Sequence, residues 1–211
     1  MISQSAEART CAAAALAILC SGCASGAPEG GAEAGRPAST TTLVGGCGPA
    51  PGLETLYVLP FGIGQAFELT QGNCAGTSHS GRFQYSFDFR LPMGTPVLAA
   101  RAGRVVTVRS NRPDGTNRTG DENFVIVRHE DGLFSRYIHL RQGSARVAEG
   151  DRVSVRDTLA LSGNSGRSRF PHLHFDVARG CTTGRCVTVP SAFSNAVPPI
   201  PRERTPVVAL E

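Results

Sequence analysis

Residues 170–177 read FPHLHFDV and contain two of the five histidines of this 211-residue chain, one residue apart. Apolar and polar side chains alternate along the stretch, which is the pattern of a β-strand with one buried face. Alternate side chains of a strand point to the same side, so His172, His174 and Asp176 are expected to share one face. Two imidazoles on one face either bind a metal ion or work beside one.

Similar short runs recur along the chain, separated by Gly, Pro, Asn and Asp. The candidate strands are Phe83–Phe89, Pro96–Ala99, Gly103–Arg109, Phe124–His129, Leu133–His139, Arg152–Val155, Thr158–Ser162 and His172–Ala178. Glu130-Asp131-Gly132 suits the turn of a hairpin. Because no useful helical periodicity follows the N-terminal segment, the sequence predicts a mainly antiparallel β domain. Its expected core includes Phe83, Phe87, Phe89, Leu173 and Phe175.

The N-terminal segment, residues 1–22, has the shape of a secretory signal peptide. An apolar run too short to span a bilayer follows Arg9 and ends in small residues before Cys23. It resembles a bacterial lipoprotein signal, in which Cys23 is acylated, although Cys20 stands where that pattern usually has leucine. Residues 23–43 are rich in Ala, Gly, Pro, Ser and Thr and are expected to be a disordered linker. We expect one domain over 44–190 and an irregular tail over 191–211.

Cysteine usage agrees with export. After removal of the signal and acylation of Cys23, an even set remains: Cys47, Cys74, Cys181 and Cys186. In an oxidising compartment this predicts two disulfides, Cys181–Cys186 across a short loop and Cys47–Cys74. A structural zinc site is the rival interpretation, but the chain has no CxxC spacing to support it.

The charge of the chain is mildly basic. All 21 basic residues are arginine and the formal net charge is +4, which is compatible with an anionic polymer as partner. The sequence has no basic-aromatic stripe and no nucleic-acid motif, so no nucleic-acid partner is expected.

Two further residues complete a candidate metal site. His79 precedes the first candidate strand, and Asp88 points away from the apolar face of that strand. A lone strand aspartate is more often solvated. Together with His174, however, these residues supply two imidazoles and one carboxylate, a set that leaves an open coordination position for water.

Five elements in order carry a resemblance to a known family. They are His79-x8-Asp88, Gly94-Thr95-Pro96-Val97, Tyr137-Ile138-His139-Leu140, Gly163-Asn164-Ser165-Gly166 and Pro171-His172-Leu173-His174-Phe175. Over about residues 55–180 the chain resembles the LytM/lysostaphin type of zinc metallopeptidase, peptidase family M23. The resemblance implies a small antiparallel β-sheet fold of the duplicated hybrid motif type, sandwich-like and bent into a groove, with Zn²⁺ at its base.

The resemblance also implies a role for each histidine of the motifs. His79, Asp88 and His174 are then the zinc ligands, and His139 and His172 are the catalytic residues that flank the metal. Either histidine can act as general base while the other stabilises the oxyanion or protonates the leaving amine. The chain departs from many family members in the eight residues between His79 and Asp88, which must loop or bulge.

Other polar residues have plainer interpretations. His129 precedes a turn and matches no motif, so it is expected to be solvated. Asp176 either holds a metal ligand in place or is a surface carboxylate, and the sequence leaves both open. Arginines near the groove could meet substrate carboxylates, and the candidates are Arg82, Arg167 and Arg169.

The implied function is that of an exported, monomeric zinc endopeptidase that acts on the stem or cross-link peptides of peptidoglycan. Its expected location is the cell envelope or periplasm, with a lipid anchor at Cys23. The alternative is a noncatalytic module that binds peptidoglycan or activates another hydrolase. A non-haem iron oxygenase also uses two histidines and one carboxylate, but the motifs and the predicted disulfides disfavour it.

Overall fold

The computed structural model describes residues 56–76, 78–181 and 186–211. The elements are β1 (Leu56–Tyr57), β2 (Ala66–Gln71), the 3-10 helix η1 (Gly81–Phe83), β3 (Ser86–Phe89), β4 (Pro96–Leu98), β5 (Gly103–Arg109), β6 (Phe124–Arg128), β7 (Phe134–Ile138), β8 (Arg152–Val153), β9 (Thr158–Leu161), β10 (Leu173–Arg179), β11 (Val187–Thr188), β12 (Ala192–Phe193) and β13 (Pro206–Val208). The predicted signal peptide, acylated Cys23 and linker lie outside the described residues. Within them, no helix combines the length and hydropathy needed to span a membrane.

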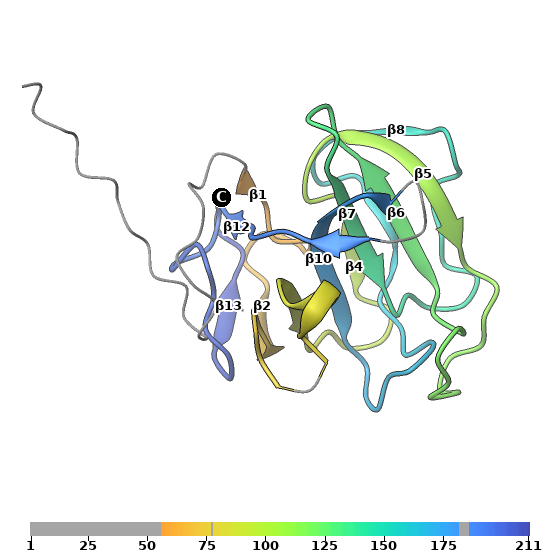
Figure 1. Cartoon of the computed structure of the whole chain (residues 1–211), viewed down its shortest axis with the longest axis horizontal. Coiled ribbons are helices and arrows are strands. Elements are labelled where there is room, and N and C mark those ends of the chain that lie inside the picture. The colour runs from red at the N-terminus through yellow and green to blue at the C-terminus, as the bar shows by residue number, and fades with distance from the viewer. Residues whose placement is uncertain (1–55, 77, 182–185) are drawn as a thin grey trace, which may run out of the picture. The chain divides into compact units, whose positions relative to one another are not determined.

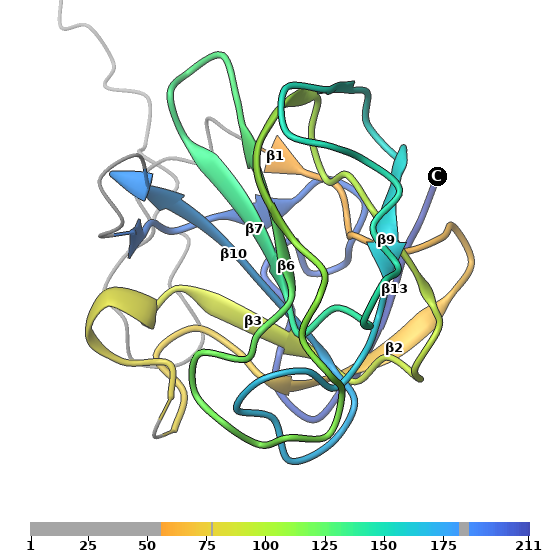
Figure 2. The ribbon, with the colours of Figure 1, turned by 90° about the vertical axis from the view of Figure 1, so that its right-hand side faces the viewer.

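A nine-stranded sheet organises the domain. Figures 1 and 2 show how its labelled strands lie in space. Its main path runs β13-β2-β3-β10-β7-β6-β5-β8, and β11 pairs with the far end of β10. Two small two-stranded sheets, β4-β9 and β1-β12, complete the fold. All the pairings are antiparallel except β1 with β12, so the predicted antiparallel β class is confirmed.

The strand β10 holds the central place that its alternating pattern predicted. It lies between β3 and β7 and is hydrogen-bonded to both (Figure 2). Leu173, Phe175 and Val177 are fully buried on one face, where the ring of Phe175 packs against that of Phe193. The histidines and Asp176 therefore project from the other face.

The predicted hairpin between β6 and β7 forms, but one expectation about it is wrong. Leu133 donates its backbone N–H to the Asp131 carboxylate in the turn. His129 is buried rather than solvated, with 3 % exposure. Its Nδ1 lies 2.8 Å from the Ala102 carbonyl oxygen and its Nε2 3.0 Å from the Ser135 hydroxyl, so its polar atoms find partners inside the domain.

Phe83 also departs from the prediction. The expected strand Phe83–Phe89 begins only at Ser86, because the segment before it forms η1, closed by a hydrogen bond from the Phe83 N–H to the Ser80 carbonyl. Phe83 is therefore only half-buried, whereas Phe87 and Phe89 are in the core as expected. The eight-residue spacing before Asp88 is thus accommodated as a loop with one helical turn.

The C-terminal segment, predicted as an irregular tail over 191–211, contains two short strands, β12 and β13. Strand β12 pairs with β1, and β13 pairs with β2 over Pro206–Val208. The Asn195 side chain accepts a hydrogen bond from the Leu59 N–H at 2.7 Å and ties this segment to the domain.

The disulfide predicted between Cys181 and Cys186 is present. Cys47 lies outside the described residues, so its pairing with Cys74 stays a prediction.

Candidate metal centre

Two neighbouring strands and one loop bring together the predicted ligands. Asp88 of β3 and His174 of β10 face each other in the strand register, and His79 comes from the loop that follows β2. One ligand atom from each of the three residues lies within 4.8 Å of the others. Their side chains are 1 %, 11 % and 12 % exposed for His79, Asp88 and His174. The strand pairing therefore places residues 86 positions apart in one nearly buried cluster.

The tautomer of His79 is set by the backbone. Its Nδ1 lies 2.7 Å from the Gly72 carbonyl oxygen, which can only accept, so Nδ1 carries the proton. Its buried Nε2 has no hydrogen-bond partner, yet lies 3.2 Å from Oδ2 of Asp88. Two lone pairs facing each other at this distance are stabilised by a cation placed between them.

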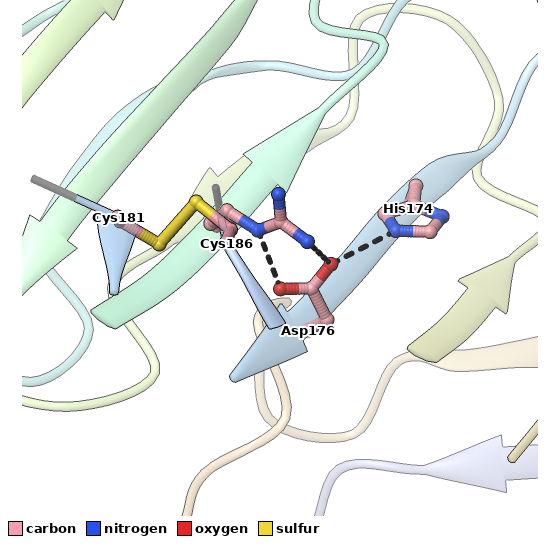
Figure 3. Close-up of a disulfide and its surroundings, with 5 residues drawn as sticks. His174, Asp176, Cys181 and Cys186 are labelled. Carbon is pink, nitrogen blue, oxygen red and sulfur yellow. Dashed lines mark hydrogen bonds and ion pairs between the residues drawn. A yellow bond between two sulfur atoms is a disulfide. The ribbon is translucent and has the colours of Figure 1, made fainter. Parts of the chain in front are cut away.

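His174 is held on its other side by a buried ion pair. Its Nε2 donates to Oδ2 of Asp176 at 3.0 Å (Figure 3). Arg136 of β7 stands opposite Asp176 in the register and donates two hydrogen bonds to it, of 2.7 and 2.6 Å. Asp176 is fully buried, which rules out the interpretation as a surface carboxylate. With Nε2 engaged, Nδ1 of His174 is the nitrogen that faces Asp88, at 2.8 Å.

The charges of this cluster favour an ionised carboxylate. Burial raises the pKa of Asp88, but the hydrogen bond from His174 outweighs it and holds that pKa well below its usual range. The pKa of Asp176 is likewise lowered, because the charge of Arg136 overcomes the effect of burial. Burial lowers the pKa of His174, yet hydrogen bonds to Asp176 and Asp88 raise it to about 9. A cation bound at Nδ1 of His174 would take the place of that proton, and two imidazoles with one carboxylate are a ligand set that fits Zn²⁺.

The other two histidines lie beside the cluster. His172, one residue before the start of β10, has its Nε2 3.9 Å from Oδ1 of Asp88. His139 follows the end of β7, and its ring centroid is 4.5 Å from that of His172. The backbone of His139 is left-handed, with φ of 66°, an uncommon conformation for a residue with a side chain that is found at functional sites. The five residues singled out in the sequence therefore converge.

Backbone carbonyl groups orient both of these histidines. Nδ1 of His139 lies 2.7 Å from the Ser165 carbonyl oxygen, and Nδ1 of His172 lies 2.9 Å from that of Phe170. Each Nδ1 therefore carries a proton and each Nε2 keeps its lone pair. Burial is the main cause that lowers the pKa of His139, to about 3, and nearby His172 and His174 add to it. Burial also lowers the pKa of His172. Both imidazoles are neutral at pH 7 and can accept a proton.

The loop before β10 contributes residues whose roles the sequence did not reveal. The Ser165 hydroxyl donates to the Leu140 carbonyl at 2.7 Å and accepts from the Asn123 N–H at 2.9 Å. The Ser168 hydroxyl lies 3.0 Å from Nδ1 of His172. The motif Gly163-Asn164-Ser165-Gly166 marked this loop, but hydrogen bonds from backbone atoms leave no signature in side-chain types.

A cleft of about 720 Å³ opens beside the cluster. Its lining includes His139 and His174, the apolar side chains Phe83 and Ile138, and both cysteines of the disulfide. It also includes four arginines: Arg82, Arg109, Arg136 and Arg167. Of the arginines suggested by the sequence, Arg82 and Arg167 line the cleft and Arg169 does not.

Comparisons with known proteins agree with this geometry. The family model for Peptidase family M23 matches residues 82–186. The chain is 37% identical over 94 residues to the peptidoglycan DD-endopeptidase ShyA of Vibrio cholerae, covering 44% of this chain and 20% of that protein. It is 34% identical over 97 residues to the glycyl-glycine endopeptidase ALE-1 of Staphylococcus capitis, covering 46% of this chain and 25% of that protein. The chain thus spans about a fifth to a quarter of the length of these relatives.

Solved structures are similar as well. The catalytic domain of the prophage-encoded M23 protein EnpA from Enterococcus faecalis is 26% identical, with a TM-score of 0.45, over 66% of this chain and 93% of that one. The family match includes Asp88, His139, His172 and His174, while His79 lies just before it. Over residues 82–186 this chain is therefore similar to peptidase family M23.

Proposed function

We propose that this protein is a zinc endopeptidase that hydrolyses peptide bonds in the stem or cross-link peptides of bacterial peptidoglycan. The observation that carries the proposal is the pairing of a two-histidine, one-carboxylate cluster with two neutral histidines whose Nε2 atoms are free to react. Peptidases of family M23 depend on zinc. The relatives ShyA and ALE-1 are named as endopeptidases, and ShyA as one of peptidoglycan.

The assigned roles follow from the nitrogen atoms that remain available. His79 would bind zinc through Nε2, His174 through Nδ1, and Asp88 through its carboxylate. When bound, zinc supplies a Lewis acid that activates water and polarises a carbonyl group. His139 or His172 takes the proton of the attacking water on Nε2, and a histidine protonated in this way can donate to the departing amine.

Export follows from the substrate that we propose, because peptidoglycan lies outside the cytoplasmic membrane. The disulfide Cys181–Cys186 supports an oxidising compartment. Acylation of Cys23, which would anchor the protein to a membrane surface, remains part of the proposal on the strength of the sequence pattern alone.

Mass spectrometry of digested peptidoglycan tests this function and identifies the bond. Purified protein incubated with peptidoglycan should release new amino termini, and a chelator should abolish the release until zinc is restored. The His172→Ala variant serves as the inactive control. If no new amino termini are released from peptidoglycan of several cross-link types, the proposed endopeptidase activity is overturned and the alternative, a noncatalytic peptidoglycan-binding module, is favoured.

A further inference from the structure

The cleft is lined by more positively charged than negatively charged side chains. Four arginines and one glutamate are the ionisable residues there besides the histidines and the disulfide cysteines. Arg136 is neutralised by Asp176, and Arg109 lies 3.4 Å from the carboxylate of Glu122. Among the described residues, neither Arg82 nor Arg167 has a carboxylate partner for its side chain. The cleft therefore holds two uncompensated guanidinium groups.

Arg82 stands next to the metal cluster. Its guanidinium carbon lies 4.7 Å from the centroid of the Phe83 ring, and that of Arg136 lies 5.4 Å from the same centroid. The Phe83 ring in turn makes an edge contact with His174, with centroids 6.2 Å apart. Phe83 is thus a stacking platform that holds Arg82 near a proposed zinc ligand.

Arg167 lies on the loop that positions a proposed catalytic histidine. It follows Gly166 and is two residues after Ser165, whose carbonyl binds Nδ1 of His139. Its backbone N–H points to Glu122 at 3.4 Å, but its exposed side chain forms no hydrogen bond or ion pair with the part of the chain that the structure describes. One uncompensated arginine, Arg82, therefore lies near His174. The other, Arg167, lies on the loop whose Ser165 carbonyl orients His139.

We propose that Arg82 and Arg167 bind free carboxylate groups of the substrate peptide, so that the enzyme selects acidic, unamidated peptides over neutral ones. This inference rests on the proposed function for the nature of the substrate. A guanidinium group matches a carboxylate in a two-pronged geometry and stays charged at all relevant pH values. The bound cation would add to the attraction, since two neutral imidazoles and one carboxylate leave it a net positive charge.

Binding can be measured separately from turnover. The full chain with His172→Ala, loaded with zinc, is titrated with two synthetic stem-type peptides that differ only in whether their carboxyl groups are free or amidated. We expect the free-carboxyl peptide to bind more tightly, with an affinity that falls as salt is added. Arg82→Gln and Arg167→Gln should each weaken its binding roughly three- to tenfold and leave binding of the amidated peptide unchanged.

Arg169→Gln is the matched control, because Arg169 is exposed, lies two residues from Arg167, and does not line the cleft. Equal affinity for the two peptides, no measurable binding of either, or an effect of Arg169→Gln as large as that of Arg82→Gln would overturn the inference. If the protein hydrolyses amidated and unamidated peptidoglycan equally well, the inference about carboxylate binding is overturned and the proposed endopeptidase function stands. Binding that depends on free carboxyl groups, without any hydrolysis, would support the inference and overturn the proposed endopeptidase function.

Discussion

His174 uses its two ring nitrogens for different purposes. Nε2 donates to the buried Asp176, and Nδ1 faces Asp88 across the proposed metal position. Carboxylates that bind the second nitrogen of a ligating histidine fix its tautomer and its orientation. Metal affinity is therefore expected to depend on a residue that does not touch the ion.

Replacing Asp176 tests this dependence. Asp176→Asn removes the charge that Arg136 and His174 share, and it should weaken zinc binding roughly 10- to 100-fold. Competition with a chromophoric chelator measures the affinity. Asp131→Asn, which changes an exposed partner of Arg101, should leave the zinc affinity as it is. Equal zinc affinities for wild type and Asp176→Asn would show that the ion pair is only structural.

The proposed ligands and the proposed catalytic residues should separate in a second experiment. His79→Ala removes one of three ligands, so the protein should lose its stoichiometric zinc. His172→Ala should keep the zinc and lose turnover by roughly 10²- to 10⁴-fold, the contribution of a positioned general acid or base. Elemental analysis and peptidoglycan release give the two readouts. A His172→Ala protein as active as wild type would remove His172 from the mechanism.

Sequence reasoning identified the side chains of the site better than their partners. The histidines and Asp88 are uncommon polar residues in apolar strands, so they stood out, and the structure brings them together. The role of Arg136 went unnoticed, because its ion pair with Asp176 depends on the pairing register of β7 and β10, which the sequence does not show. His129 was misjudged because the hairpin turn next to it is exposed while its own side chain turns into the domain.

At the scale of elements, the loop before β10 sets the position of His139. Gly166 has φ of 73°, and a Cβ atom there would lie 2.4 Å from Glu122. Any side chain at this position is strained and also collides with a neighbouring segment. The loop that presents the Ser165 carbonyl to His139 is therefore intolerant of substitution.

Gly166→Ala is expected to reduce both stability and turnover. The free energy of unfolding should fall by about 3 kcal/mol, from the left-handed backbone together with the collision. Turnover should fall further than the unfolded fraction explains, because the carbonyl that orients His139 moves. Urea unfolding and peptidoglycan release are the measurements. Gly132→Ala is the control: its φ is 81° but a Cβ atom there meets nothing within 4 Å, so only about 1 kcal/mol should be lost.

Strand positions were predictable where the alternation is long. The strand β5 has the predicted bounds Gly103–Arg109. The strands β6 and β9 differ from the prediction by one residue at one end, and β7 and β10 differ by one residue at each end. The short strands β12 and β13 were missed, because neither shows a sustained alternation of apolar and polar residues. The segment before β3 was misread because its aromatic residues alternate, although turn hydrogen bonds fold it into η1.

For the whole molecule, His129 gives the stability a dependence on pH. Burial lowers its pKa below the ordinary value of 6.5, so the folded protein keeps it neutral where the unfolded chain is already protonated. The unfolded state then binds more protons below pH 6.5, and stability falls as the pH falls, by at most about 1.4 kcal/mol per pH unit from this residue. His129→Asn does not titrate, so its unfolding free energy should change less between pH 7 and pH 5. Equal changes in urea titrations of both proteins would contradict this role.

The strand β13 occupies the flank of β2 and so caps one end of the nine-stranded sheet. Without it, β2 would present a row of unpaired amide and carbonyl groups, which is a template for joining another polypeptide. A protein truncated after Pro201 should therefore self-associate, eluting from a sizing column as dimers or larger particles, while the intact chain elutes as a smaller species. Strand β13 thus protects the protein against aggregation.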